Sequence, residues 1–220
     1  MEDKVTKIEL VPLSNRYVTS LIDVHRTVYP AEFNVRLGDY FIKNFFNFFI
    51  GKEGFRGLVA LKDGKAIGYL LGYVYNKRST LDDYLLKQFA KAILRNPFRV
   101  FDRIVFKKII EKIKAKLFKK SVGTAGKKFE IDYSKAYYMF LIAITPEGRG
   151  HNIGRKLMLE MERLAVIDGY RYFLGSVAVE NLKVLRMWST IGYEVVEIDP
   201  DNPAKYVFKD TIRTKDDRKS

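Results

Sequence analysis

The sequence predicts an α/β fold in which helices cover a mixed β-sheet. Three observations support this prediction. Strand-like and helix-like segments alternate through residues 136–192, and a clear β-hairpin pattern occupies residues 55–75. The chain has 220 residues, of which 47% are hydrophobic, enough for one sizeable core.

The first 75 residues supply a strand, two helices and the hairpin. The opening run, VTKIELVPL at 5–13, is typical of a strand. An apolar stripe then predicts a helix that ends near Pro30, and the phenylalanine-rich residues 36–50 predict a second helix. In the hairpin at 55–75, two β-rich runs flank a Lys-Asp-Gly turn.

A basic segment follows the hairpin. Residues 77–128 hold 16 lysines and arginines against four acids, a net charge of +12, whereas the rest of the chain adds only +2. The helical spacing of Phe101, Val105 and Leu117 predicts amphipathic helices with one apolar face. We therefore expect a basic helical insertion at 79–128 on a nearly neutral body.

The remaining segments complete the sheet. We expect a buried strand at 136–145, a helix at 154–169, a strand at 170–181 and a helix at 182–192. A final hairpin then closes the domain.

Composition excludes several classes of protein. The chain has no cysteine, which rules out disulfides, thiolate zinc sites and a cysteine nucleophile. It has no HExxH motif or other metal-ligand pattern, so no metal is expected. No signal peptide or apolar run of about 20 residues is evident. We expect a soluble cytoplasmic protein.

Glycines crowd the turn that joins the strand at 136–145 to the next helix, in the sequence TPEGRGHNIGRKL. Free N–H groups of such a turn, together with the helix dipole, suit an anion. Glycine also allows close backbone approach. The stretch matches neither GxxxxGK[ST] nor the GxGxxG dinucleotide pattern. A well-capped turn on a charged helix is the alternative interpretation.

Together with the strand YYMFLIA before it, this stretch resembles the acyl-CoA loop of the GNAT superfamily of N-acyltransferases. The usual form is V-x-P-x-x-R-G-x-G-x-G, and Ile144, Pro146, Arg149 and Gly150 stand in register. The run NLKVLRMWSTIGYEV at 181–195 resembles the closing motif of that superfamily. The resemblance implies a mostly antiparallel sheet with two splayed parallel strands. It also implies a GNAT acyltransferase domain at 1–78 and 129–213. The charged last residues, 214–220, are expected to form a flexible tail.

By this resemblance acetyl-CoA is the co-substrate, and the glycine loop holds its diphosphate. The main chain of Ile142 and Ile144 would pair with the pantetheine where the strands splay. Asn152 replaces the middle glycine of the family, and asparagine is the residue that best tolerates a left-handed backbone after glycine. The expected CoA-binding residues are Ile142, Ile144, Arg149, Gly150, His151, Asn152, Ile153, Gly154, Arg155, Asn181 and Trp188.

The resemblance implies acetyl transfer to a primary amine, and without cysteine direct attack in a ternary complex is the economical mechanism. The N–H of Ile142 would polarise the thioester carbonyl. Trp188 stands where the family has its usual proton donor, a tyrosine, which leaves Tyr193 or water for that role. The candidate bases are His25 and Glu180, although His25 also fits a packing role and Glu180 a solvated loop.

The basic insertion and the run VHRTVYPAEF resemble GNAT proteins found with bacterial surface-polysaccharide biosynthesis genes, which implies an amino-sugar acceptor. For residues 79–128 three interpretations stay open. They are a helical pair over the core, an interfacial helix on an anionic membrane, and, favoured only by charge, a nucleic-acid surface. The alternative functions are a non-catalytic acyl-CoA-binding module and a membrane-surface binding protein. Homo-oligomerisation stays open.

Overall fold

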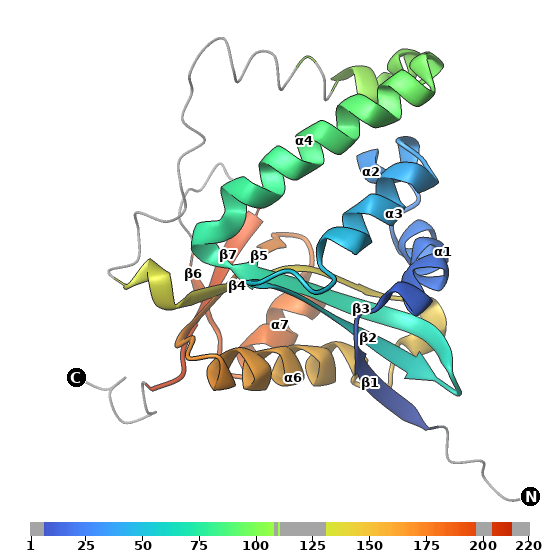
Figure 1. Ribbon diagram of the computed structural model, residues 1–220. Helices are drawn as coiled ribbons and strands as arrows, with labels where there is room; N and C mark the ends of the chain where they lie inside the picture. Colours follow the sequence, from blue (N-terminus) through green and yellow to red (C-terminus); the bar gives the residue numbers. More distant parts are fainter. Residues whose placement is uncertain (1–6, 108–109, 111–130, 197–203, 213–220) are drawn as a thin grey trace, which may run out of the picture.

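The computed structural model describes residues 7–107, 110, 131–196 and 204–212, and it contains a seven-stranded sheet (Figure 1). The strand order is β1-β2-β3-β4-β5-β7-β6, and only β4 and β5 run parallel. The predicted mixed, mostly antiparallel sheet is confirmed. The strands are β1 (Ile8–Pro12), β2 (Phe55–Lys62), β3 (Lys65–Val74), β4 (Ala136–Ile144), β5 (Tyr172–Ala178), β6 (Glu194–Val196) and β7 (Ala204–Asp210).

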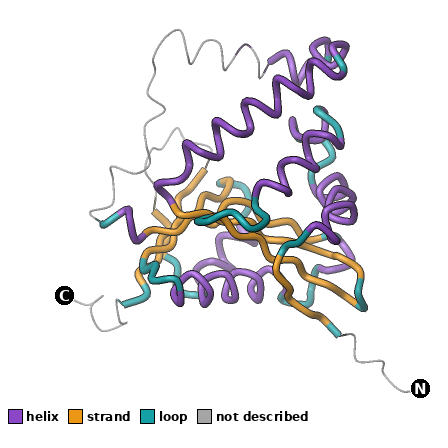
Figure 2. Tube along the Cα trace, viewed as in Figure 1, coloured by secondary structure: helices purple, strands orange, loops and turns teal. Residues whose placement is uncertain are grey.

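Helices cover both faces of this sheet (Figure 2). In Figure 1, α1, α3 and α4 lie above the sheet and α6 lies below it. Because both faces are covered, β3 is buried along almost its whole length: Leu70 packs with α6 and α7, whereas Tyr69 and Leu71 pack with α1 and α3. The helices are α1 (Val18–Val28), α2 (Phe33–Arg36), α3 (Asp39–Phe48), α4 (Arg78–Arg95), α6 (Ile153–Ile167) and α7 (Leu182–Thr190).

The parallel pair β4–β5 separates partway along its length. The two strands are paired from Ala136 with Tyr172 to Met139 with Gly175. Beyond that point β4 continues to Ile144 and β5 to Ala178 without pairing to each other. The predicted splay between the two parallel strands is therefore confirmed, and it opens toward the glycine-rich turn.

The basic insertion begins with α4, which packs against α2 and α3 through a small apolar cluster. One detail of the predicted apolar face is wrong, because Val105 is buried but Phe101 is 84% exposed. Pro97–Phe101 form a 3₁₀ turn, and Asp102 then accepts the N–H groups of Ile104 and Val105 at the start of a new helical segment. The α-helical spacing is therefore interrupted at Asp102. Leu117 and the tail at 214–220 lie outside the described residues.

Candidate active site

The glycine-rich turn leads from the end of β4 into α6 through two left-handed residues. Pro146–Gly148 form a 3₁₀ turn, then Gly150 has φ +83° and Asn152 has φ +56° before α6 begins at Ile153. Asn152 thus adopts the left-handed conformation expected of it. The first bond of α6 is donated by Lys156 to the carbonyl of Asn152, so the N–H groups that precede it have no acceptor within the helix.

A buried glycine brings the start of α6 close to β4. A Cβ atom at Gly154 would lie 3.1 Å from Cδ1 of Ile144 and 3.2 Å from Sδ of Met187. Arg149 and Arg155 are exposed around this turn. The turn therefore offers free amides, the positive end of a helix dipole and two guanidinium groups to an anion.

The strand pairing determines the direction of the main-chain groups of Ile142 and Ile144. Ile144 lies opposite Gly68, and the N–H of Thr145 donates to the carbonyl of Ile67 at 2.9 Å. A hydrogen bond between these flanking residues identifies Gly68 and Ile144 as a non-hydrogen-bonded pair. Ile142, two positions earlier in the same unbroken register, has the same orientation. The N–H and carbonyl groups of both residues therefore point away from β3, into the gap beside β5.

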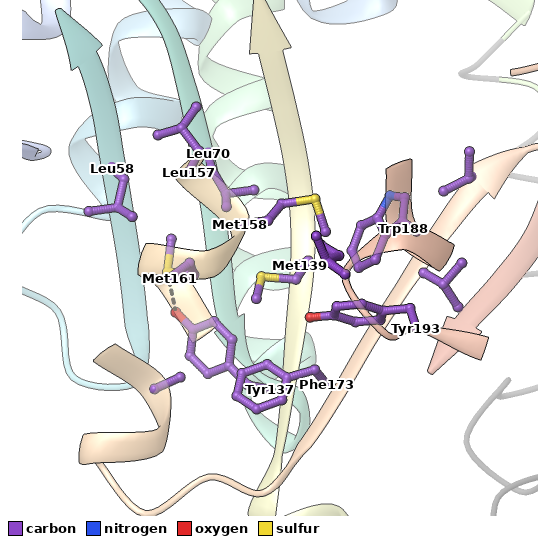
Figure 3. Packing of buried hydrophobic residues seen from close by; sticks show 14 of the residues in the cluster. Leu58, Leu70, Tyr137, Met139, Leu157, Met158, Met161, Phe173, Trp188 and Tyr193 are labelled. Carbon is purple, nitrogen blue, oxygen red and sulfur yellow. Dashed lines mark hydrogen bonds between the residues drawn. The ribbon is translucent and has the colours of Figure 1, made fainter. Parts of the chain in front are cut away.

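A cavity of about 190 Å³ occupies this gap, and Trp188 is one of the residues that line it. Trp188 is 3% exposed, and its buried Nε1 has no hydrogen-bond partner among the described residues. Gly175, the last residue of β5 paired with β4, makes room for the indole, because a Cβ there would lie 2.9 Å from Cη2 of Trp188. In Figure 3 the nitrogen of the indole is at the top of the ring, and the pale yellow arrow of β4 points in the same direction.

The Tyr29 side chain lines the same cavity from the end of α1. Its hydroxyl donates a hydrogen bond to the carbonyl of Ile142 at 2.5 Å. Burial raises the pKa of Tyr29 to about 12, so the hydroxyl keeps its proton at neutral pH. Tyr29 thereby holds the strand segment whose N–H faces the gap.

His25, one helical turn before Tyr29, lies in the core and does not line the cavity. Its Nδ1 lies 2.6 Å from the hydroxyl of Tyr69, and its buried Nε2 has no partner among the described residues. Burial lowers the pKa of His25 to about 4, which keeps the imidazole neutral at pH 7.

A larger cavity of about 610 Å³ lies where β2 begins and β3 ends, away from the turn that joins these two strands. It borders the ion pair between Arg56 and Asp168, which is 2.8 Å long, and it contains none of the predicted site residues. We assign the site to the smaller cavity, because only that one adjoins the outward main-chain groups of β4.

Known proteins share the fold of this chain. Residues 111–193 match the family model described as the acetyltransferase (GNAT) family. The PaiA N-acetyltransferase from Thermoplasma acidophilum, solved in complex with coenzyme A, superposes with a TM-score of 0.57, covering 93% of this chain and 99% of that chain at 14% identity. This chain has the GNAT fold.

Two other solved structures show the same fold. An aminoglycoside N-acetyltransferase in complex with CoA has a TM-score of 0.59 at 11% identity, with 92% of this chain and 97% of that chain covered. The ribosomal-protein-S18-alanine N-acetyltransferase from Escherichia coli has a TM-score of 0.53 at 9% identity, with 92% and 91% covered. No curated protein matches the sequence.

The predicted site residues in and just before the segment 181–195 differ in where the structure places them. Asn181 lines the cavity and caps α7, where its side chain accepts the N–H of Val184 at 3.3 Å. Glu180, just before it, is exposed. Tyr193 is buried against Trp188, and its hydroxyl donates to Glu162 at 3.4 Å instead of lining the cavity.

Tyr29 is not among the site residues predicted from the sequence, although the sequence contains a signal for it. His25 and Tyr29 are four residues apart in the predicted helix, a spacing that places two side chains on one face.

Among the described residues no group of three or more His, Cys, Asp and Glu side chains could hold a metal ion.

We predict that Asn152→Gly leaves the affinity for CoA within about twofold, because glycine adopts the same left-handed conformation without strain and keeps the N–H in place. Isothermal titration calorimetry measures this affinity. A loss of tenfold or more would mean that the Asn152 side chain itself contacts the ligand, contrary to the backbone role assigned here.

Proposed function

We propose that this protein is an acetyl-CoA-dependent N-acetyltransferase that acts on a primary amine of a small acceptor. The observation that carries the proposal is the outward main chain of Ile142 and Ile144, in a gap that leads to the turn at Arg149–Gly154. Pantetheine is an extended chain with amide groups, so it can pair with the free strand edge as an added strand would. The diphosphate of CoA then lies at the turn.

The reaction is direct transfer in a ternary complex. The neutral amine attacks the thioester carbon, the C–N bond forms as the C–S bond breaks, the amine releases a proton and the thiolate takes one up. The N–H of Ile142 donates to the oxygen on which negative charge develops. Tyr29 supports this donor by engaging the carbonyl of the same residue.

We choose the proposed base and acid by whether each candidate side chain is exposed to solvent or buried. Glu180 is the proposed base, because it is exposed, directly precedes the cavity-lining residue Asn181 and can pass a proton to solvent. His25, proposed from sequence as a base, is buried and holds Tyr69 instead. Water is the proposed acid for the thiolate, since the hydroxyl of Tyr193 is directed to Glu162.

Trp188 contributes a hydrogen bond to the leaving sulfur and no proton, because an indole N–H donates but is not a useful acid. The change Trp188→Phe removes this donor and keeps a ring beside Tyr193. We expect kcat to fall about five- to tenfold while the Kd for CoA changes less than about twofold. Thiol release and calorimetry measure the two constants. An unchanged kcat would contradict the role of the indole.

The acceptor class follows from the sequence resemblance, which favours an amino sugar. The test is CoA thiol release across amino sugars, polyamines and peptides, and it gives a clean signal because the protein itself has no cysteine. We expect turnover with amino sugars. Turnover confined to polyamines or peptides would contradict that acceptor class but leave N-acetyl transfer intact.

A non-catalytic acyl-CoA-binding module is the second candidate, and the absence of tyrosine at position 188 favours it. The same assay separates the two functions. Stabilisation of the protein by acetyl-CoA without thiol release on any amine would support the module and contradict the enzyme.

A further inference from the structure

The end of α4 presents an unusual apolar surface, which we call the α4 tip: Leu94, Phe98 and Phe101. These side chains are 81%, 79% and 84% exposed, the three highest values among the large apolar side chains that the structure describes. They lie within eight residues of each other, at the end of α4 and in the 3₁₀ turn Pro97–Phe101. A cluster of exposed apolar side chains marks an interaction surface.

Specific contacts hold the α4 tip in this arrangement. The guanidinium of Arg99 donates to the carbonyl of Arg36 at 2.7 Å, and the guanidinium of Arg95 stacks on the Tyr40 ring at 3.8 Å. On the inner side, Ala92 and Val105 are buried against α2 and α3. The phenylalanines thus project outward from a turn that is anchored on its other face.

Positive charge surrounds the α4 tip. Residues 84–107 contain six lysines and arginines and a single acid, Asp102. Asp102 is partly used in capping the next helical segment and lies 3.9 Å from Arg36. The side chains of Lys87, Lys91 and Arg103 are exposed. The surface therefore combines apolar side chains that need burial with cations that need an anionic partner.

We propose that the α4 tip docks onto the surface of an anionic lipid bilayer. Leu94, Phe98 and Phe101 would enter the boundary between headgroups and acyl chains, and the surrounding lysines and arginines would bind the acidic headgroups. The binding is peripheral, since no described helix is long and apolar enough to cross a membrane. A second copy of the chain is a poorer partner, because the net charge of +14 makes two copies repel.

This inference goes beyond N-acetyl transfer, because no residue of the α4 tip lines the cavity beside Ile142. It nevertheless has a consequence for that reaction. α4 packs on α2 and α3, on the same side of the sheet as α1, which brings Tyr29 to the cavity. Docking would therefore hold the face of the sheet that carries α1 and Tyr29 toward the lipid surface.

Vesicle flotation of the full chain tests the proposal. We expect the protein to float with phosphatidylcholine vesicles that contain about 30% phosphatidylserine and not with pure phosphatidylcholine, and we expect the binding to weaken steeply between about 0.1 M and 1 M salt. Equal binding to both vesicle types, or no binding to either, would overturn the proposal.

Two variants locate the contact. Phe98→Ser with Phe101→Ser should reduce binding to the anionic vesicles at least about tenfold. The matched control is Val166→Ser with Ile167→Ser, which removes apolar side chains that are 44% and 68% exposed at the end of α6, on the opposite face of the sheet. Control binding should stay at the wild-type level, and equal losses in the two variants would contradict a specific tip contact.

Separate readouts exclude the other partners and keep this test distinct from that of the enzyme. CoA affinity should be the same in the phenylalanine variant and the wild type, which also reports that the variant is folded. Light scattering should show no oligomer that this variant dissociates, and single-stranded RNA should not compete with the vesicles. Dissociation of an oligomer, or competition by RNA, would assign the α4 tip to that partner and overturn the lipid proposal.

Discussion

Replacing Gly150 with valine will weaken the binding of CoA by at least about tenfold while the protein remains folded. Gly150 has φ +83°, a conformation that a β-branched residue adopts only at a cost of about 1–2 kcal/mol. A Cβ there meets no atom within 4 Å, so the change causes strain and no clash. Relief of the strain turns the neighbouring N–H groups away from the diphosphate. Calorimetry on the purified variant measures the loss.

The matched control for this variant is Gly169→Val, at the opposite end of α6. Gly169 has φ +90°, and a Cβ at this position would likewise meet no atom within 4 Å, so the same strain arises far from the proposed diphosphate site. We expect a similar decrease in thermal stability and an unchanged affinity for CoA. Equal affinities in the two variants would show that the turn after β4 does not hold the coenzyme.

Acidification will destabilise the wild-type protein through His25, and His25→Gln will remove that part of the effect. The unfolded state takes up a proton on His25 near the ordinary pKa of 6.5, whereas the folded state does so only near pH 4. Between these values the unfolded state binds more protons than the folded state. The contribution of the neutral His25 to stability is therefore fully present above pH 6.5, and it is lost as the pH falls toward 4. The difference corresponds to about 3 kcal/mol of unfolding free energy.

Urea unfolding at a series of pH values between about 4 and 7 measures this contribution as the difference between wild type and variant. Carboxyl groups that titrate in the same range cancel in that difference. His151 provides the control, since it is the other of the two histidines and is exposed, and His151→Gln should reproduce the wild-type pH dependence. Parallel curves for wild type and His25→Gln would contradict a neutral, buried His25.

The sequence predicts the elements of the sheet well, because their signals are local. Lys62, Asp63 and Gly64 mark the β2–β3 hairpin. Asparagine tolerates a left-handed backbone, which accounts for Asn152 at the turn before α6. The splay of β4 from β5 came from the family resemblance alone. No local pattern announces it, because it depends on where pairing between two distant strands stops, at Met139 and Gly175.

The parts of the site that depend on tertiary contact were not predictable in the same way. Tyr29 reaches Ile142 across 113 positions of sequence, and His25 meets Tyr69 across 44. A single histidine on an amphipathic helix fits either a core or a surface position until its partners are known. Phe101 shows the converse: its helical spacing indicated burial, but a 3₁₀ turn and the Asp102 cap direct it outward.

Amide hydrogen exchange with and without coenzyme A tests the central proposal most directly, since that proposal concerns main-chain N–H groups. Saturating coenzyme A should slow exchange in peptides that cover residues 140–155, the unpaired end of β4 and the turn into α6, and should leave residues 49–57 beside the larger cavity unchanged. Unaltered exchange across 140–155, or protection confined to 49–57, would contradict the assignment of the CoA site to the gap between β4 and β5.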